Sequence, residues 1–337
     1  AYYYHQNENS FLGCTDELAC NYNIDANTHD DSCDYSCHNS GNYSLNFNGI
    51  DDYISLDPPF EGYNSNYSIA LSFYANSYDG RMIYFNRNHD MSSYIRLTNN
   101  PANNNIELNF YVGTDAQNCP GYTTNSGYCA LDLYYSVALN QWYDVVGTYN
   151  GQIMKLYVDG NLVNSIEVIG NQYWSGPPLD GQQGYWYTRI GDNNGGGYIP
   201  IDGKIDNIVI YDTALSENQI LNLNTNLLNG NEQNIISLYK FNASNGNVLF
   251  DHSGNQNHGT IYGASWIDNS INQCCFESYG DINCDTIIDI SDIIIMIDII
   301  LDLIEYSDDQ IYCADVNGDS IVDISDLILL IDTILGF

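Results

Sequence analysis

Basic residues are scarce in this chain of 337 residues. It contains seven Lys and Arg against forty-three Asp and Glu, which gives a formal net charge of −36 at pH 7. Such a surface repels the phosphates of nucleic acids and the headgroups of anionic lipids. The composition therefore excludes nucleic-acid binding and polybasic membrane docking, and it leaves metal ions and neutral or cationic partners.

Long apolar runs and catalytic signatures are also lacking. No stretch of eighteen apolar residues occurs, so the sequence predicts no transmembrane segment. No Gly-x-Ser-x-Gly elbow occurs, and the six histidines are scattered, so nothing indicates nucleophilic catalysis. The chain begins at Ala1 without a methionine, as a mature protein does after removal of a signal peptide. We therefore expect a secreted protein.

Ten cysteines fall into three regions, and each region holds an even number of them. Even local counts are typical of disulfides in secreted proteins. Zinc is the alternative, but Cys33 and Cys37 have no second pair at zinc-like spacing, and only His29 and His38 lie nearby. We expect disulfides among Cys14, Cys20, Cys33, Cys37, Cys119, Cys129, Cys274, Cys275, Cys284 and Cys313.

Two twelve-residue segments, 281–292 and 315–326, repeat one pattern thirty-four residues apart. Positions 1, 3, 5, 9 and 12 carry oxygen-bearing side chains, and position 7 offers a backbone carbonyl, which is the ligand spacing of an EF-hand-like calcium loop. The sequence thus predicts two Ca²⁺ ions. Their ligands would be Asp281, Asn283, Asp285, Ile287, Asp289 and Asp292 in one loop and Asp315, Asn317, Asp319, Ile321, Asp323 and Asp326 in the other.

An almost wholly apolar run follows each loop, at residues 293–303 and 327–335. A helix that is apolar on every face has to be buried against something. We expect these two helices to pack against a neighbouring subunit. Outside the cell, loops of this type remain loaded with calcium and serve as structure rather than as sensors.

Residues 41–267 alternate between short apolar patterns and turn residues. Strands are predicted at 68–74, 106–112, 143–149 and 155–158, because apolar residues alternate there with polar ones. Asp159-Gly160 predicts a tight hairpin turn, and residues 216–223 predict a short helix capped by Ser216. Many short strands predict a β-sandwich.

Four blocks of this region, at residues 44–54, 140–143, 156–163 and 201–220, resemble the LamG-like, concanavalin A-like jelly roll in the expected order. The resemblance implies two antiparallel sheets and a ligand site for glycans or proteins on a sheet face or loop rim. Residues 277–337 resemble a type I dockerin, a duplicated calcium module that binds a cohesin domain. Residues 13–33 resemble a short cysteine module of secreted bacterial proteins.

Retaining glycosidases of the concanavalin A-like fold carry a Glu-x-Asp-x-x-Glu string, and this chain has none, although pairs of Asp residues are an alternative. Its glutamates Glu61, Glu107, Glu167 and Glu217 are isolated, so no acid and nucleophile pair can be identified. We expect a protein without catalytic activity.

An aromatic, glycine-rich stretch between residues 173 and 187 is the candidate ligand-binding segment, because flat aromatic faces stack on sugar rings or on a neighbouring protein. Plain packing is the alternative, since tyrosine is frequent throughout the chain. Its aromatic residues are Tyr173, Trp174, Tyr185, Trp186 and Tyr187. A third Ca²⁺ site is predicted in the jelly roll at Asp51, Asp52, Asp202 and Asp206, with turn capping as the alternative.

Glycosylation sites are predicted from short acceptor triplets. Three Asn-x-Ser triplets mark Asn42, Asn66 and Asn242. Four Asp-Thr or Asp-Ser pairs resemble an O-glycan acceptor of Bacteroidetes-type bacteria and mark Thr213, Thr286, Ser320 and Thr333. Thr286 and Ser320 stand at position 6 of the calcium loops, where EF-hands usually have glycine.

The sequence predicts a mainly β protein with four parts. These are a disulfide-rich module at 1–40, a jelly-roll sandwich at 41–267, a linker at 268–276 and a helical calcium module at 277–337. The favoured hypothesis is a structural or adhesive subunit of the bacterial cell surface that associates with copies of itself or with another surface protein, as in a fibre. The alternatives are a carbohydrate-binding component docked on a larger complex and a glycoside hydrolase of unrecognised type.

Overall fold

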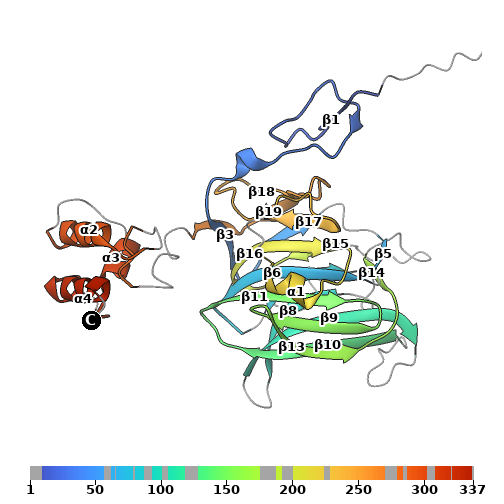
Figure 1. The fold of residues 1–337 in the computed structure, drawn as a ribbon. Coiled ribbons are helices and arrows are strands. Elements are labelled where there is room, and N and C mark those ends of the chain that lie inside the picture. The colour runs from blue at the N-terminus through green and yellow to red at the C-terminus, as the bar shows by residue number, and fades with distance from the viewer. Residues whose placement is uncertain are drawn as a thin grey trace, which may run out of the picture. The chain divides into compact units, whose positions relative to one another are not determined.

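The computed structural model describes residues 10–56, 62–64, 66–78, 80–86, 93–100, 105–117, 128–174, 187–191, 200–223, 228–269, 279–283, 287–301, 308–319 and 321–335 (Figure 1). The chain divides into two compact units, one made of residues 1–40 and 44–267 and the other of residues 41–43 and 268–337. The finer boundaries expected from the sequence, at residues 40, 267 and 276, stay predictions. None of the helices within the described ranges is long and apolar enough to cross a membrane.

The first unit is built on two antiparallel sheets, which confirms the predicted mainly β sandwich. The first sheet, here called the front sheet, has the strand order β10 (Tyr128–Val137), β9 (Asn105–Gln117), β8 (Ser93–Asn100), β7 (Gly80–Asn86), β15 (Tyr187–Ile190), β4 (Tyr53–Leu56), β19 (Gly259–Tyr262) and β18 (Val248–Leu249). The second, called the back sheet, has the order β13 (Asn161–Glu167), β12 (Ile153–Val158), β11 (Trp142–Tyr149), β6 (Tyr67–Ala75), β16 (Asp202–Tyr211), β3 (Tyr43–Asn48) and β20 (Ser265–Asp268), and β17 (Ile235–Tyr239) also pairs with β16. A two-stranded ribbon joins β14 (Gln172–Trp174) to β5 (Gly62–Asn64).

The predicted strands and turn are confirmed. The expected segments lie within β6, β9, β11 and β12. The hairpin between β12 and β13 turns at Asp159 and Gly160, with φ of 50° and 74°. Both residue types tolerate positive φ, which a two-residue turn between twisted strands requires.

The core lies between the two sheets and takes every second side chain from each strand, as the period of an extended chain dictates. Leu108, Phe110 and Val112 of β9 belong to it, together with Val145 of β11. The sheets approach closely at Gly147, where an added Cβ atom would lie 2.7 Å from the Phe110 ring. Glycine is needed here because the aromatic ring fills the space of a side chain.

A short helix, α1 (Glu217–Leu221), lies against the other face of the back sheet. Ser216 caps it in a capping box with Gln219, as the sequence predicted. Ile220 of the helix packs with Ala70, Val146 and Val209 of the sheet in a second apolar cluster. This face of the back sheet is therefore partly covered.

The N-terminal segment is held by disulfides rather than by a large core. It contains the two-residue strands β1 (Leu12–Gly13) and β2 (Thr28–His29) and the 3₁₀ turn η1 (Ser36–His38). Cys14 is bonded to Cys33, and Cys20 is bonded to Cys37. Its small cluster of Cys14, Ala19 and Tyr35 packs against Phe250 of the sandwich.

The second unit contains α2 (Ile290–Ile300), α3 (Asp308–Ala314) and α4 (Ile324–Leu335). Its core is small, and Ile282, Met296, Cys313, Ala314 and Leu330 are its buried members. The helices α2 and α4 therefore follow the two repeated loops, as expected.

Candidate functional site

The face of the front sheet that is turned away from the core carries a group of tyrosine and arginine side chains. In β8, the core residues Ile95 and Leu97 alternate with Tyr94 and Arg96, and in β9 Leu108, Phe110 and Val112 alternate with Asn109 and Tyr111. We call this side of the sheet the tyrosine–arginine face; Tyr134 and Tyr262 are exposed on it, whereas Arg81, Tyr94 and Asn109 are buried. Its members are Tyr53, Arg81, Tyr94, Arg96, Asn109, Tyr111, Asp132, Tyr134, Arg189 and Tyr262.

Two pairs of stacked tyrosines form the aromatic part of this face. Tyr94 and Tyr111 are opposite each other in β8 and β9, and their rings are stacked with centroids 4.5 Å apart and planes 2° apart. Tyr53 and Tyr262 are opposite each other in β4 and β19, with ring centroids 4.6 Å apart. The face reaches from Tyr134 in β10 to Tyr262 in β19, which is about 28 Å at ordinary strand spacing.

Three guanidinium groups lie on these rings. The Cζ atoms of Arg81 and Arg96 are 4.7 and 4.9 Å from the centre of the Tyr94 ring. Arg189 lies over Tyr53, with Cζ 3.8 Å from the ring centre. Such cation–π contacts hold the guanidinium groups in place beside the aromatic surfaces.

Polar atoms on this face keep unused hydrogen-bonding capacity. Within the described residues, Arg96 Nε, Asn109 Nδ2 and Asp132 Oδ1 are buried and have no hydrogen-bond partner. Asn109 Oδ1, by contrast, accepts a bond from Thr98 Oγ1 at 2.7 Å. Buried polar atoms are nearly always paired in folded proteins, so a group of unpaired ones is a feature of ligand sites.

Burial raises the pKa of the Asp132 carboxyl above its ordinary value, although the nearby Arg96 and Arg81 lower it. Asp132 is also hydrogen-bonded to Tyr134, whose pKa is raised to about 12 by burial and by the Asp132 charge. The phenol therefore keeps its proton at neutral pH and can donate a hydrogen bond.

The predicted aromatic segment is only partly placed. Tyr173 and Trp174 lie in β14, where their backbones pair with Tyr63 and Gly62 of β5. Tyr187 is the first residue of β15, two residues before Arg189. Tyr185 and Trp186 lie outside the described residues. The role predicted for this segment stays a prediction.

The two repeated loops of the second unit share one geometry. Asp292 Oδ1 accepts the N–H of Asn283 at 3.1 Å, and its Oδ2 accepts the N–H of Asp289 at 3.0 Å. Thirty-four residues later, Asp326 makes the corresponding bonds to Asn317 at 3.0 Å and to Asp323 at 2.9 Å. The carboxylate at position 12 therefore ties the start of each loop to position 9.

In the second loop, other predicted ligands accept hydrogen bonds from backbone N–H groups of the loop itself. Asp315 Oδ1 and Asn317 Oδ1 both accept the N–H of Asp319, at 3.1 and 2.8 Å. Asp319 Oδ1 accepts the N–H of Ile321 at 2.9 Å. Each carboxylate oxygen has two lone pairs, so these bonds leave room for cation coordination. Asp285 lies outside the described part of the first loop.

The donor set fits calcium on grounds of charge. The buried loop carboxylates are Asp281, Asp292, Asp315 and Asp326. Residues 268–337 contain fourteen Asp and two Glu but no Lys, Arg or His, so this unit has no basic side chain of its own to balance them. Buried charges need a partner, and Ca²⁺ prefers carboxylate and carbonyl oxygens.

The third predicted metal site is not assembled from all four of its residues. Asp51 Oδ1 accepts a hydrogen bond from the side-chain amide of Asn48 at 2.9 Å. Asp52 Oδ2 accepts one from the backbone N–H of Asn48, also at 2.9 Å. Asp202 accepts a bond from Asn76 Nδ2 at 3.0 Å. Asp206 lies four residues further along β16, about 13 Å from Asp202 in an extended strand. Only Asp52 of these residues accepts a backbone N–H of the turn, and a metal at this place stays a prediction.

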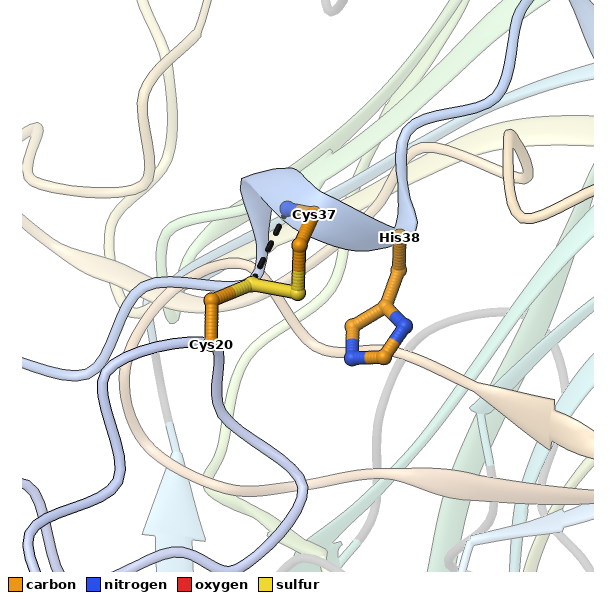
Figure 2. Close-up of side chains that lie close together, drawn as sticks. All are labelled: Cys20, Cys37 and His38. Carbon is orange, nitrogen blue, oxygen red and sulfur yellow. Dashed lines mark hydrogen bonds between the residues drawn. A yellow bond between two sulfur atoms is a disulfide. The ribbon is translucent and has the colours of Figure 1, made fainter.

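Disulfides rather than zinc explain the N-terminal cysteines in this structure. Figure 2 shows the Cys20–Cys37 disulfide with His38 beside it, and the potential ligand atoms of the three residues lie within 4.8 Å of one another. Disulfide sulfurs are not thiolates, which are the form that binds zinc. The His38 ring stacks on Phe250 with centroids 3.7 Å apart, and His38 Nε2 lies 2.8 Å from the Leu18 carbonyl. Cys129 and Cys313 are also disulfide-bonded, and no described cysteine is free.

Histidines line the contact between the N-terminal segment and the sandwich. His258 Nε2 lies 2.7 Å from Asp16 Oδ2, which also accepts a bond from the Tyr35 hydroxyl at 2.6 Å. His258 Nδ1 accepts the Asp251 N–H at 2.9 Å, which leaves Nε2 as the ring nitrogen that faces Asp16. Burial lowers the pKa of the neighbouring His252 to about 4.

Acid is expected to lower the free energy of unfolding, because His252 at this contact is buried. The pKa of His252 is about 4 in the folded state and about 6.5 when unfolded, so the unfolded chain binds more protons between these values. The stabilisation is present above pH 6.5 and is lost as the pH falls towards 4, by up to about 3 kcal/mol. Urea unfolding between pH 7 and pH 4.5 measures it, and His252→Asn should flatten the profile in that window. An unchanged slope in the variant would contradict the assignment.

The predicted glycosylation residues are scattered. Asn66 Nδ2 donates to Thr213 Oγ1 at 3.4 Å, so these two predicted acceptors contact each other. Thr333 Oγ1 donates to the Leu329 carbonyl on α4, and the carbonyls of Asn42 and Asn242 accept backbone bonds. Thr286 and Ser320 lie outside the described residues. Glycosylation of any of these seven residues stays a prediction.

The tyrosine–arginine face was missed by the sequence reasoning. Its local signal was available, because Tyr94 and Arg96 alternate with Ile95 and Leu97 in a run that reads as a strand. The scarcity of arginine in the chain was a second signal. Neither was used, and the order of the strands that joins β4 and β19 to β8 and β9 is not visible locally.

Known structures of similar fold include a putative carbohydrate-binding protein from Bacteroides ovatus, which is 17% identical, with a TM-score of 0.50 over 68% of this chain and 60% of that one. The CBM40 of Ruminococcus gnavus IT-sialidase bound to α2,3-sialyllactose is 15% identical, with a TM-score of 0.38 over 53% and 94%. Domain 4 of a Geobacillus stearothermophilus arabinanase in complex with arabinotriose is 16% identical, with a TM-score of 0.36 over 53% and 74%.

The chain thus spans 60% of the length of the B. ovatus protein, and likeness at this level of identity concerns the fold. A comparison with curated proteins finds no match. Residues 48–221, just over half of the chain, match the family described as the concanavalin A-like lectin/glucanases superfamily, and the chain belongs to that family.

Proposed function

We propose that this protein binds a glycan on its tyrosine–arginine face, without hydrolysing it. The observation that carries the proposal is the combination of two stacked tyrosine pairs with buried, unpaired polar atoms on one sheet face. Sugars present apolar C–H faces and many hydroxyl groups. Aromatic walls with a few fixed polar groups are the usual lining of such sites.

The polar groups on this face suit hydroxyl groups. Arg96 Nε and Asn109 Nδ2 are donors, and Asp132 Oδ1 is an acceptor while the carboxyl is ionised. Each would gain a hydrogen bond that it does not make to the described part of the chain. Satisfying a buried polar atom contributes about 1–3 kcal/mol, so three of them are a substantial source of affinity.

Binding without hydrolysis agrees with the carboxylates that the face offers. Asp132 lies opposite Tyr111 in β9, and Glu107 lies four residues from Tyr111 along the same strand. That separation is about 13 Å, whereas glycosidases place their two carboxyl groups about 5 to 9.5 Å apart. Glu107 also accepts a bond from Asn100 Nδ2 at 2.6 Å.

The comparisons give this proposal support at the level of the fold. The B. ovatus structure is described as a putative carbohydrate-binding protein. The disulfides agree with an oxidising, extracellular setting, where glycans are abundant. The test is calorimetric titration of the chain with a panel of oligosaccharides. Binding that survives disruption of the tyrosine pairs would contradict the proposed site.

A second candidate function is docking through the second unit. Exposed apolar residues form a stripe that occurs twice, since Ile290, Ile294 and Leu301 of the α2 segment correspond to Ile324, Ile328 and Leu335 of α4. These pairs are thirty-four residues apart, like the loops. The resemblance to a dockerin makes this stripe a candidate protein-binding surface.

Charge favours a different protein over a second copy as the docked partner. Residues 268–337 carry sixteen acidic side chains and no basic one, so two such units repel each other. Sedimentation in calcium is therefore expected to show a monomer over the accessible concentration range. Oligomers that disappear in an Ile294→Asp, Ile328→Asp variant would instead identify a second copy as the partner, as in the fibre hypothesis.

A further inference from the structure

Histidines gather where the N-terminal segment meets the sandwich. The sequence contains six, and two of them lie outside the described residues. The other four are all at this contact, His29 and His38 on the segment and His252 and His258 on the sandwich. Histidine is the side chain whose ordinary pKa lies between pH 5 and pH 8, so this contact is placed to respond to mild acid.

The contact itself is made by side chains rather than by a shared sheet. His258 Nε2 lies 2.7 Å from Asp16 Oδ2, and Gln256 Nε2 lies 3.2 Å from His29 Nδ1. The apolar part consists of Phe250 against the small cluster of the segment. A contact of this kind can open locally while the rest of the protein stays folded.

The segment has connections of its own that do not depend on the sandwich. Both of its disulfides, Cys14–Cys33 and Cys20–Cys37, join residues within the segment. The Cys20 N–H donates to the carbonyl of Asp34 at 2.7 Å. A disulfide restricts the chain whether or not the segment touches the sandwich. The segment can therefore move as one piece.

His252 is the histidine of this contact that opposes a charge most strongly. Burial lowers its pKa to about 4, and the Tyr35 ring meets it edge-on with centroids 6.2 Å apart. The charged or titratable groups that face it are Tyr35, His38 and Asp34 from the segment and Lys240 and His258 from the sandwich. After burial, Lys240 and the two histidines lower the pKa further, because a positive group repels a protonated ring, and only Asp34 raises it.

The Asp16–His258 pair does not cancel this effect. Although burial raises it, hydrogen bonds from the Tyr35 hydroxyl and the Leu18 N–H hold the pKa of Asp16 below its ordinary value. Asp16 therefore stays ionised between pH 7 and pH 5. A charged His258 ring would attract Asp16 more strongly, but its Nδ1–H would then face the Asp251 N–H that Nδ1 accepts at 2.9 Å. These two consequences of charging His258 oppose each other.

We propose that this contact is an acid-sensitive latch, in which protonation of His252 releases the N-terminal segment from the sandwich as one disulfide-bonded piece. At neutral pH the His252 ring is uncharged and the latch is closed. The proton binds about 300-fold more tightly once the ring is exposed, because the pKa rises from about 4 to about 6.5. Mild acid thus uncovers the sandwich surface around Phe250.

Hydrogen exchange of the full chain in calcium, followed by NMR, measures the release. Rates are corrected for the effect of pH on intrinsic exchange. The Ser40 N–H donates to the Asn242 carbonyl of the sandwich at 2.7 Å, so its protection reports on the closed latch. That protection is expected to fall about twentyfold from pH 7 to pH 5, which is the factor given by the two pKa values of His252. The amides of β6 and the Cys20 N–H should keep their protection.

Variants assign the effect to His252. His252→Asn is expected to reduce the change between pH 7 and pH 5 to less than threefold, because Asn does not titrate. Tyr35→Phe is the matched control, since it removes the hydroxyl that donates to Asp16 at 2.6 Å but no group that titrates in this range. It should lower the protection of the Ser40 amide equally at both pH values and keep the twentyfold change.

Two results would overturn the proposal. An equal loss of protection in β6 and at Ser40 would show that acid unfolds the sandwich instead of releasing the segment. A twentyfold change that persists in His252→Asn would show that another group controls the release. Should this variant fold poorly, the comparison of β6 with Ser40 in the unchanged chain still decides whether the segment is released by itself.

Discussion

Removal of calcium is expected to unfold the second unit while the sandwich stays folded. The unit has a small core and buries the carboxylates of Asp281, Asp292, Asp315 and Asp326 with no basic residue of its own. Without a cation these charges repel one another at low dielectric. At a calcium concentration one hundred times the dissociation constant, each site would contribute about 2.7 kcal/mol. Loss of both would exceed what so small a core can offset.

Hydrogen exchange with and without a chelator measures this effect by region. Amides of residues 281–335 should lose protection in the chelator, and those of β6 and β11 should keep theirs. Asp326→Asn should reduce the calcium response by about half, because one of the two loops loses its position-12 carboxylate. Asp332→Asn removes the same charge from an exposed position of the same helix and is the control. Equal protection in both conditions would show that the loops are not calcium sites.

Loss of the exposed tyrosines is expected to remove glycan binding without loss of fold. Tyr134 and Tyr262 stand at opposite ends of the tyrosine–arginine face, and each is 47% exposed, so their removal leaves little cavity. Each aromatic contact is expected to contribute about 1 kcal/mol, and each single Tyr→Ala variant should weaken binding about fivefold. The double variant should weaken it at least twentyfold.

The matched control is Tyr135→Ala. Tyr135 is 38% exposed and follows Tyr134 directly in β10, so its side chain lies on the other side of the strand. It should bind the glycan as the unchanged chain does, with the same thermal unfolding midpoint. If the single and double variants at Tyr134 and Tyr262 bound the glycan as well as the control does, the glycan would have to contact another surface.

Much of the fold was predictable because its signals are local. The alternation of apolar and polar residues predicted the strands β6, β9, β11 and β12, and Asp159-Gly160 predicted the hairpin between β12 and β13. Ser216 marked the start of α1 through its cap. The thirty-four-residue repeat predicted two matching loops, and Asp292 and Asp326 make matching hydrogen bonds in them.

The candidate binding face was not predictable in the same way, because it is formed by long-range pairing. Tyr53, Arg189 and Tyr262 come from strands far apart in the sequence, and they meet only because β4 lies between β15 and β19. Alternation can assign a side chain to one face of its own strand. It cannot order eight strands in a sheet.

Net charge was no guide to the positions of the basic residues. The total of −36 correctly describes the whole chain, and it predicts neutral or cationic partners. Charge is a sum, however, and the sum conceals where the few basic residues lie. Only the fold reveals that Arg81, Arg96 and Arg189 lie on one face.

A crystal structure of the chain with a bound oligosaccharide tests the central claim most directly. The account predicts sugar rings against Tyr134 and Tyr262, the exposed tyrosines of the tyrosine–arginine face, with a hydrogen bond from Arg96 Nε to the glycan. A glycan found on the back sheet, or at the β5–β14 ribbon with the tyrosine–arginine face unchanged, would contradict it.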